Sequence, residues 1–319
     1  MHLNRGLLFW GLALLIAGGT ALAVQQGFID RDTVAGAWRL WPLILVAIGL
    51  SVILSRTPFA PIGTVAAALV VGIAAGALIS VGPIAAGCTG AEPTNMQDKT
   101  GSFNARADVV LRFDCGTLQV RSVTDSQWTV SSGRTGGGAA TVAASANKLE
   151  VSSNNDGQWW TNARQRWVVS LPASTTYQLD VQPNAADATI DLAGGQFDRV
   201  TVQPNAGSVH VDLRDAKVDI LDVSLNAGSA AIQIGPGASM SGTLSVNAGS
   251  IELCTEPGTA LRFVVNGSVA FSHNLDGSGL VRSGDTWSTS GYDTATNQVE
   301  LQVSGNAGSF TLNPEGGCS

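Results

Sequence analysis

Charged side chains are scarce in this sequence. Lys, Arg, Asp and Glu account for 13% of its 319 residues, against roughly a quarter in a typical soluble domain. Residues 1–87 hold only four arginines and two aspartates, which leaves 13 of the 17 basic and 22 of the 24 acidic residues in 88–319. An acidic segment so poor in Lys and Arg lacks the cation clusters that bind phosphate. This excludes nucleic acid as a partner of that segment, and also docking onto anionic lipid headgroups.

Cysteine is also rare, and its spacing excludes the short metal and redox motifs. The four cysteines are Cys88, Cys115, Cys254 and Cys318, and no two are close enough for a C-x-x-C site. They allow three disulfide pairings, between which the sequence does not choose, and inert unpaired thiols are the other alternative. A disulfide would require an oxidising compartment. The stretch A-A-G-C at 85–88 follows an apolar run as a lipidation signal does, so lipid attachment at Cys88 is a further alternative.

Catalytic groups are missing in every familiar arrangement. Only three histidines occur, His2, His210 and His273, and none has a Ser, Cys or Asp partner at a recognisable spacing. The phosphate-binding loop, the H-E-x-x-H zinc motif and the dinucleotide fingerprint are absent from the sequence. The acidic residues do not share one repeat position throughout, as a catalytic or calcium-binding groove would require. We therefore predict no enzyme, no catalytic residue, no metal and no cofactor, with a carbohydrate-active solenoid enzyme as a remote alternative.

Long apolar runs dominate residues 1–87, at 6–24, 40–54 and 62–87. As a helix the third run would extend roughly 39 Å, enough to cross a bilayer core of about 30 Å, and the first run is also long enough. The second run is shorter, so it either tilts across the bilayer with added residues or does not span it. We predict about three transmembrane helices in a multi-pass membrane protein, with the lipid bilayer as their partner.

The side of the membrane on which the C-terminal part lies depends on the second run. Three spans with the N-terminus inside place residues 88–319 outside the cytoplasm, whereas two spans place them within it. The flanking arginines divide two against two, so they do not decide the orientation. The composition of 88–319, rich in Ser, Thr, Asn and Gly and poor in Lys, favours the extracytoplasmic side.

A repeat is the most informative feature of the C-terminal part. Residues 88–102 are polar with Pro and Gly and are predicted to be a linker, and short alternating strands begin at Phe103. Asn184, Asn205, Asn226 and Asn247 are spaced 21 residues apart, and the last three open the tetrapeptide N-A-G-S, which returns at 306–309. Each copy contains two short stretches with alternating apolar residues, one before and one after this tetrapeptide. We predict two short strands per copy, joined by a bend at N-A-G-S, because Asn and Gly tolerate left-handed backbone conformations.

One copy cannot fold alone. Burial of its six inward sites stabilises it by roughly 10 kcal/mol, whereas ordering its backbone costs about 1–2 kcal/mol per residue. Stacked copies share a core and pair their strands about 4.8 Å apart. We therefore predict an all-β domain over 103–319, a β-solenoid with regular 21-residue coils at 178–261. Asn184, Asn205, Asn226 and Asn247 are predicted to form a structural ladder of hydrogen-bonded amides along the stack.

An aromatic and basic cluster is the best candidate contact site. Trp159, Trp160 and Trp167 lie close in sequence to Arg164 and Arg166. Exposed Trp beside Arg suits a glycan, a peptide or a partner protein. The alternative is that these rings cap the open end of the solenoid core, which a stack of coils requires.

Two parts of the chain resemble known families. R-G-L-L-F-W-G at 5–11, G-F-I-D at 27–30 and W-P-L-I-L-V-A-I-G-L at 41–50 resemble the transmembrane region of LiaI/LiaF-like proteins. W-V-V-S-L-P-A at 167–173, the N-A-G-S copies and the stretch at 284–309 resemble the toast-rack or adhesin-type β-solenoids often attached to that region. The resemblance implies bacterial envelope proteins, some of which tune cell-wall stress signalling by restraining a sensor kinase. It implies no functional residues.

From these observations we predict a non-enzymatic protein anchored in the cell membrane. Its solenoid presents an interaction surface to a membrane sensor or another envelope protein, as an accessory regulator of envelope stress sensing. The alternative is a scaffold or adhesin at the cell surface that self-associates through open solenoid ends.

Overall fold

The computed structural model describes residues 11–12, 14–16, 19, 69, 88, 90–154 and 163–318. The chain divides into two units, Met1–Gly87 and Cys88–Ser319. The described residues of the first unit are helical, and no helix within the described part of the chain is long and apolar enough to cross a bilayer. The three predicted membrane-spanning runs fall almost wholly outside the described residues, so they stay a prediction.

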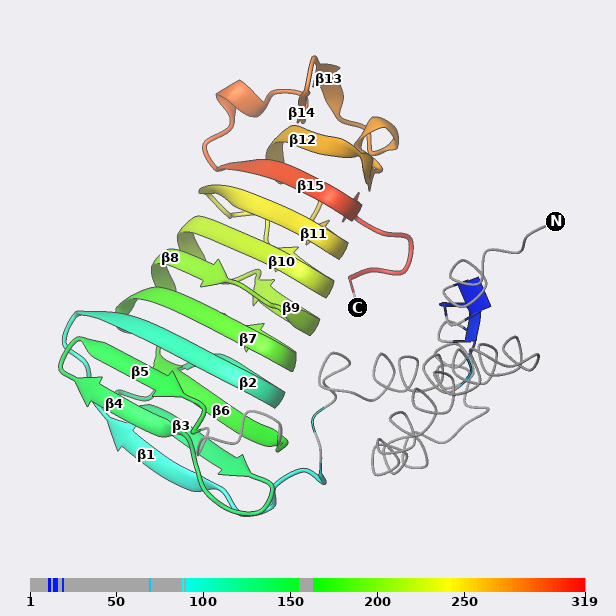
Figure 1. Ribbon diagram of the computed structural model, residues 1–319. Coiled ribbons are helices and arrows are strands. Elements are labelled where there is room, and N and C mark those ends of the chain that lie inside the picture. Colours follow the sequence, from blue (N-terminus) through cyan, green and yellow to red (C-terminus); the bar gives the residue numbers. More distant parts are fainter. Residues whose placement is uncertain are drawn as a thin grey trace, which may run out of the picture. The chain divides into compact units, whose positions relative to one another are not determined.

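The second unit is an all-β domain of stacked coils, as the repeat predicts (Figure 1). From β7 to β11 neighbouring coils pair in parallel with a register of 21 residues, so that Val181 faces Val202, Val202 faces Val223, and Val223 faces Leu244. The strands that pair in parallel along the stack are β2 (Arg106–Val123), β5 (Lys148–Ser152), β6 (Gln165–Pro172), β7 (Thr176–Asp191), β8 (Gln196–Val202), β9 (Ala206–Leu213), β10 (Lys217–Ile234), β11 (Met240–Thr255), β12 (Ala260–His273) and β15 (Gln298–Leu312).

The core lies inside the coils and is built from the alternating apolar residues. Val223 and Leu225 before the N-A-G-S of β10, and Ile232 and Ile234 after it, are at most 1% exposed. The same positions are buried in the other regular coils, apart from the half-buried Thr255 in the last copy. Each coil therefore shields the apolar rows of its neighbours, which is why the stack folds as one unit.

The bend at N-A-G-S depends on its glycine. Gly228 has a φ of +111°, and a Cβ there would lie 2.0 Å from the carbonyl oxygen of Gly207 in the preceding coil. The prediction of two separate strands per copy is correct only for the copy divided into β8 and β9; β7, β10 and β11 run through the bend without interruption. The reason is that residues at the bend keep pairing with their equivalents, as Ala227 does with Ala248.

Antiparallel strands close the N-terminal end of the stack. β1 (Gln97–Gly101) pairs with β3 (Trp128–Arg134), β3 with β6 (Gln165–Pro172), and β4 (Thr141–Ser145) with β5 (Lys148–Ser152). The prediction that residues 88–102 form a linker is therefore wrong, because β1 belongs to the sheet. Its Gly101 lies against the ring of Trp128, where a Cβ would come within 2.4 Å, so the segment is held by packing as well as by hydrogen bonds.

The C-terminal end has an order that differs from the chain order. β15 lies between β11 and β12 and pairs in parallel with both (Figure 1). Two short strands, β13 (Val281–Ser283) and β14 (Thr286–Ser288), follow β12 in an antiparallel arrangement. Single 3₁₀ turns at Leu275–Gly277 and Tyr292–Thr294 flank them.

Candidate interaction surface

The asparagines of the repeat form one hydrogen-bonded column on the surface of the stack. Each side-chain Nδ2 donates to the Oδ1 of the preceding coil: Asn205 to Asn184 at 2.8 Å, Asn226 to Asn205 at 2.6 Å, and Asn247 to Asn226 at 2.8 Å. Asn306 of β15 extends the column by donating to Asn247 at 2.8 Å, across 59 residues of sequence. The ladder therefore runs over five coils with all its amides pointing the same way.

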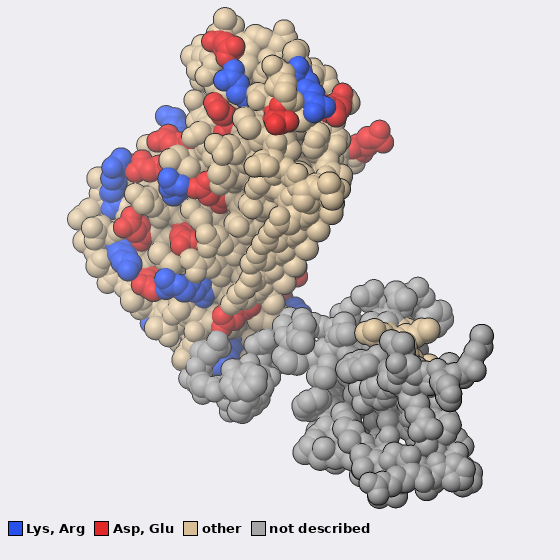
Figure 2. Space-filling view, turned by 45° about the horizontal axis from the view of Figure 1, so that its top comes forward, with Lys and Arg blue, Asp and Glu red and all other residues tan. Residues whose placement is uncertain are grey.

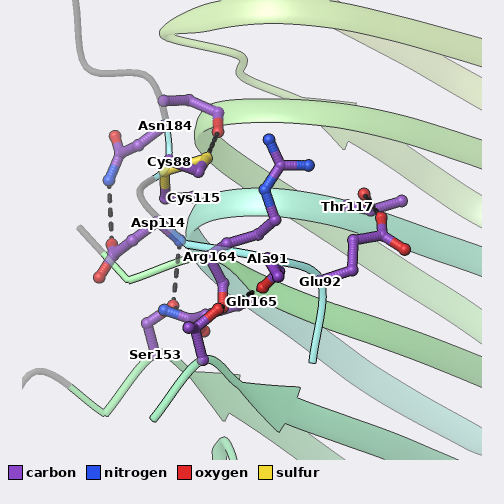
Figure 3. Close-up of a disulfide and its surroundings, with 12 residues drawn as sticks. Cys88, Ala91, Glu92, Asp114, Cys115, Thr117, Ser153, Arg164, Gln165 and Asn184 are labelled. Atoms are coloured by element: carbon purple, nitrogen blue, oxygen red, sulfur yellow. Dashed lines mark hydrogen bonds between the residues drawn. A yellow bond between two sulfur atoms is a disulfide. The ribbon is translucent and has the colours of Figure 1, made fainter. Parts of the chain in front are cut away.

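An aspartate starts this ladder. Asn184 donates to Asp114 Oδ1 at 3.2 Å (Figure 3). In β2 the residues 114–117, D-C-G-T, occupy the N-A-G-S position, since Cys115 pairs with Ala185 and Thr117 with Asp187. A carboxylate only accepts hydrogen bonds, so Asp114 fits the end of a one-way column. This coil was not predicted from the sequence, although V-V-L-R-F-D-C-G-T has the same alternation and a glycine at the bend.

The bends form a continuous, uncharged surface along the stack. We call residues 205–208, 226–229, 247–250 and 306–309 the N-A-G-S face; its residues are exposed or half-exposed. Figure 2 shows a ridged surface without Lys, Arg, Asp or Glu along the middle of the domain, with the charged side chains to one side of it and towards its ends. The corresponding residues of the first copy include an acid, Asp187, which accepts a hydrogen bond from Ser208 Oγ at 2.7 Å.

A shallow groove lies where the ladder ends. It has a volume of about 400 Å³ and is lined by residues from the bends of β11, β12 and β15, among them Val246, Asn266 and Asn306. β12 bulges here between Gly267 and Ala270, and the bulge leaves Val269 fully exposed. A partner lying along the N-A-G-S face would meet a polar groove and one apolar side chain at this end.

A disulfide lies where the ladder begins. Cys88 is bonded to Cys115, next to Asp114, with the two Cα atoms 5.4 Å apart (Figure 3). The residues that follow are fastened to the same coil end: Thr117 Oγ1 donates to Glu92 at 3.1 Å, and Glu92 lies 3.6 Å from Arg166. With its sulfur in a disulfide, Cys88 has no thiol for lipid attachment.

The second disulfide joins Cys254 of β11 to Cys318, with the Cα atoms 5.8 Å apart. Of the three pairings that the sequence allows, the structure thus contains 88–115 and 254–318. No cysteine of the described residues is left free, so the alternative of separate thiols is wrong.

The predicted aromatic and basic cluster is not a single exposed site. Trp167 is fully buried, with its ring 4.9 Å from that of Phe113 in an edge-to-face contact. The alternation of W-V-V-S-L turns it inward, so its assignment as a contact residue is wrong and it acts as a core residue. Arg166 points outward to Glu92, and Arg164 is half-buried, its carbonyl accepting from the backbone N–H of Thr135 at 2.9 Å. Trp159 and Trp160 lie outside the described residues.

Several charged side chains of the domain pair with one another. Arg214 donates to Asp212 on the same turn, and this hydrogen bond lowers the pKa of the Asp212 carboxyl. Arg112 and Lys148 likewise lower the pKa of Glu150. Within residues 88, 90–154 and 163–318 there is no group of three His, Cys, Asp or Glu side chains that could hold a metal ion.

The fold and this surface define a repeat protein of the β-solenoid class, in which coils share one core and their bends form an extended face. Residues 93–235 match the family model of the N-terminal domain of toast_rack, and residues 8–53 match that of the LiaI-LiaF-like transmembrane region. The two matches fall on the two parts of the chain in which the sequence resembles these families. No curated protein matches the chain.

Several solved structures resemble the domain. A candidate cell adhesion protein from Clostridium sporogenes is 14% identical, with a TM-score of 0.45 over 68% of this chain and 98% of that chain. A candidate adhesin from Bacteroides fragilis is 9% identical, with a TM-score of 0.30 over 70% and 100% of the two chains. One from Parabacteroides merdae is 6% identical, with a TM-score of 0.20 over 70% and 98%. Likenesses at this level assign neither a ligand nor a partner to this chain.

Proposed function

We propose that this chain is a non-enzymatic envelope protein, anchored in the membrane, whose N-A-G-S face binds a membrane sensor and regulates envelope stress sensing. The observation that carries the proposal is the ladder from Asp114 to Asn306, which holds one row of exposed side chains in a fixed geometry. A surface ordered before binding loses little conformational entropy when a partner docks. The match of residues 8–53 to a LiaI-LiaF-like transmembrane region supports a partner in the same membrane.

The chemistry of the face suits another protein. Each amide of the ladder has two N–H donors and uses one of them within the ladder, so a row of donors about 4.8 Å apart remains available. The face carries Asn, Ala, Gly and Ser, so a partner approaches closely without desolvating charges, which would be costly. The groove at the end of the ladder fixes the position of the partner along the row.

A crosslinking experiment tests the surface. A photoreactive amino acid is placed at Ser229 on the face, or at Ser239 in the turn at the other end of the same coil; both serines are exposed. In membranes of stressed and unstressed cells, position 229 is expected to yield one dominant adduct, identified by mass spectrometry as a membrane sensor. Position 239 is expected to yield none.

The charge variant Ser229→Arg makes the test specific. It is expected to abolish that adduct from a neighbouring probe at Ser208, whereas Ser239→Arg leaves it unchanged. Equal adducts from both probe positions, or an adduct that survives Ser229→Arg, would exclude the N-A-G-S face as the binding surface.

We propose further that the solenoid lies on the extracytoplasmic side. The two disulfides support this, because such bonds persist in oxidising compartments and are rare in the cytosol. A Ser239→Cys variant adds one exposed thiol to a domain whose described cysteines are paired. A membrane-impermeant maleimide should label it in intact cells; labelling only after lysis would place the domain in the cytoplasm.

Self-association through open solenoid ends has weaker support. β13 and β14 follow the last parallel coil at one end, and β1 and β3 close the other. The short, polar edges of β1 and β13, Q-D-K-T-G and V-R-S, are poor templates for pairing with another sheet.

A further inference from the structure

The final coil of the solenoid is an inserted element. β15 comes last in the chain, yet its neighbours in the stack are β11 on one side and β12 on the other. Among the described strands, β11 and β12 pair with β15 and not with each other. If β15 left, a slot one coil wide would therefore open between two unpaired strand edges.

The slot has the same chemistry as every other contact between coils. Leu301 and Val303 of β15 are buried, in register with Gly242 and Leu244 of β11. Asn306 completes the ladder on Asn247. On the other side, Gly305 leaves room for the ring of Phe271, which a Cβ at that glycine would approach to 2.0 Å. The strand that fits this slot best is β15 itself. A β15 strand from another molecule can come only from a second copy of this chain.

A covalent bond holds β15 to its neighbour. Cys318, six residues beyond the end of the strand at Leu312, is bonded to Cys254 of β11. Asn313, which directly follows β15, also binds β11. Its backbone N–H donates to the carbonyl oxygen of Leu253 at 2.8 Å, and its side-chain Oδ1 accepts from the backbone N–H of Thr255 at 2.8 Å. Both cysteines are half-buried rather than enclosed, so small thiol reagents can reach the bond.

We propose that β15 is an exchangeable coil and that the Cys254–Cys318 disulfide is the lock that keeps it in its own molecule. A dithiol reductant breaks the S–S bond, yields two cysteine thiols and is itself oxidised to a disulfide. The unlocked β15 then inserts into the slot of a second copy, which returns its own β15, and a symmetric swapped dimer forms. This inference goes beyond the proposed function: β15 contributes residues 306–309 to the N-A-G-S face, but the exchange of the strand does not depend on what binds that face.

Two complementary variants test the exchange. Full-length Cys254→Ser and Cys318→Ser chains, carrying different tags, are produced together and purified in detergent. Neither chain can form the lock within itself. In a swapped dimer, however, Cys318 of the first chain meets Cys254 of the second. Oxidised glutathione, which takes up the two electrons and becomes two glutathione thiols, is expected to produce a covalent heterodimer with a 254–318 linkage in mass spectrometry.

The controls separate exchange from chance contact and from loss of any disulfide. Each variant oxidised alone should give no covalent dimer, which would form if the single remaining thiols paired by chance contact. A Cys254→Ser/Cys318→Ser chain should form a concentration-dependent dimer in light scattering, whereas a Cys88→Ser/Cys115→Ser chain, which keeps the lock, should behave as the natural chain does. Absence of the heterodimer together with a monomeric lock-free chain would overturn the proposal.

Hydrogen exchange of the natural chain provides a measurement that does not depend on variants that fold poorly. After reduction, backbone amides of β15 at 298–312 should exchange faster, while those of β10 at 217–234 keep their protection. Equal protection of both strands in reduced protein would also overturn the proposal.

Discussion

Replacing Asn226 by alanine should destabilise the solenoid by about 1–2 kcal/mol. The side chain donates to Asn205 at 2.6 Å and accepts from Asn247 at 2.8 Å, and a protein hydrogen bond contributes roughly 0.5–1.5 kcal/mol net. Two such bonds contribute roughly 1–3 kcal/mol, and because the ladder is exposed to water, the loss should lie in the lower half of this summed range. The same change at Asn306 removes one recorded ladder bond instead of two, so it should cost about half as much.

Thermal unfolding of the full chain in detergent, with the disulfides intact, measures the difference. In a domain of this size 1 kcal/mol shifts Tm by about 2–4 °C. We expect Tm to fall most for Asn226→Ala, by roughly half as much for Asn306→Ala, and hardly at all for Ser229→Ala, a neighbouring exposed position. Equal shifts for the two asparagines, or no shift for Asn226→Ala, would show that the ladder does not stabilise the stack.

Three further changes have defined outcomes. Gly228→Ala should lower stability by more than about 2 kcal/mol in chemical denaturation, because it combines a positive φ with a contact against the carbonyl oxygen of Gly207; a cost below that of Asn226→Ala would contradict the account of the bend. Trp167→Ala should lower the free energy of unfolding by about 3–5 kcal/mol, because it removes a large core side chain. The fraction of this variant that still folds should crosslink at position 229 as the natural chain does. Burial raises the pKa of Tyr177 to about 12, from an ordinary value of about 10. Since the raised value belongs to the folded state, stability should hold up to about pH 10 and fall between pH 10 and 12; Tyr177→Phe should lose less stability across this window.

The regular part of the fold was predictable because three independent signals agree there. The 21-residue spacing of Asn184, Asn205, Asn226 and Asn247 sets the length of a coil. The period-two alternation assigns strands and an inward face, and N-A-G-S marks the bend. In the structure the residues of one repeat position face each other from coil to coil, as Val202 and Val223 do. A repeat fixes register in this way because each coil meets a copy of itself.

The candidate site was harder to predict, because exposure cannot be read from residue type. Trp167 and Arg166 are adjacent in a strand and point to opposite faces, so one packs in the core and the other pairs with Glu92. The alternation of W-V-V-S-L contained this information, but the clustering of Trp and Arg suggested a shared surface. Similarly, residues 88–102 have a linker composition, and their attachment depends on a disulfide and on β1, both of which involve distant parts of the chain.

The position of β15 shows which sequence details decide the order of coils. Every coil presents the same kind of apolar row, so alternation alone allows β12 to follow β11 as its neighbour in sequence. Phe271 of β12 prevents this. Its ring occupies the space beside Gly305, and the residue of β11 in register with Gly305 is Val246. A valine side chain there would fill the space of the ring, so β12 fits against β15 and not against β11. A glycine at a repeat position where the regular copies have Pro, Leu or Val therefore marks a specific neighbour rather than a weakened coil.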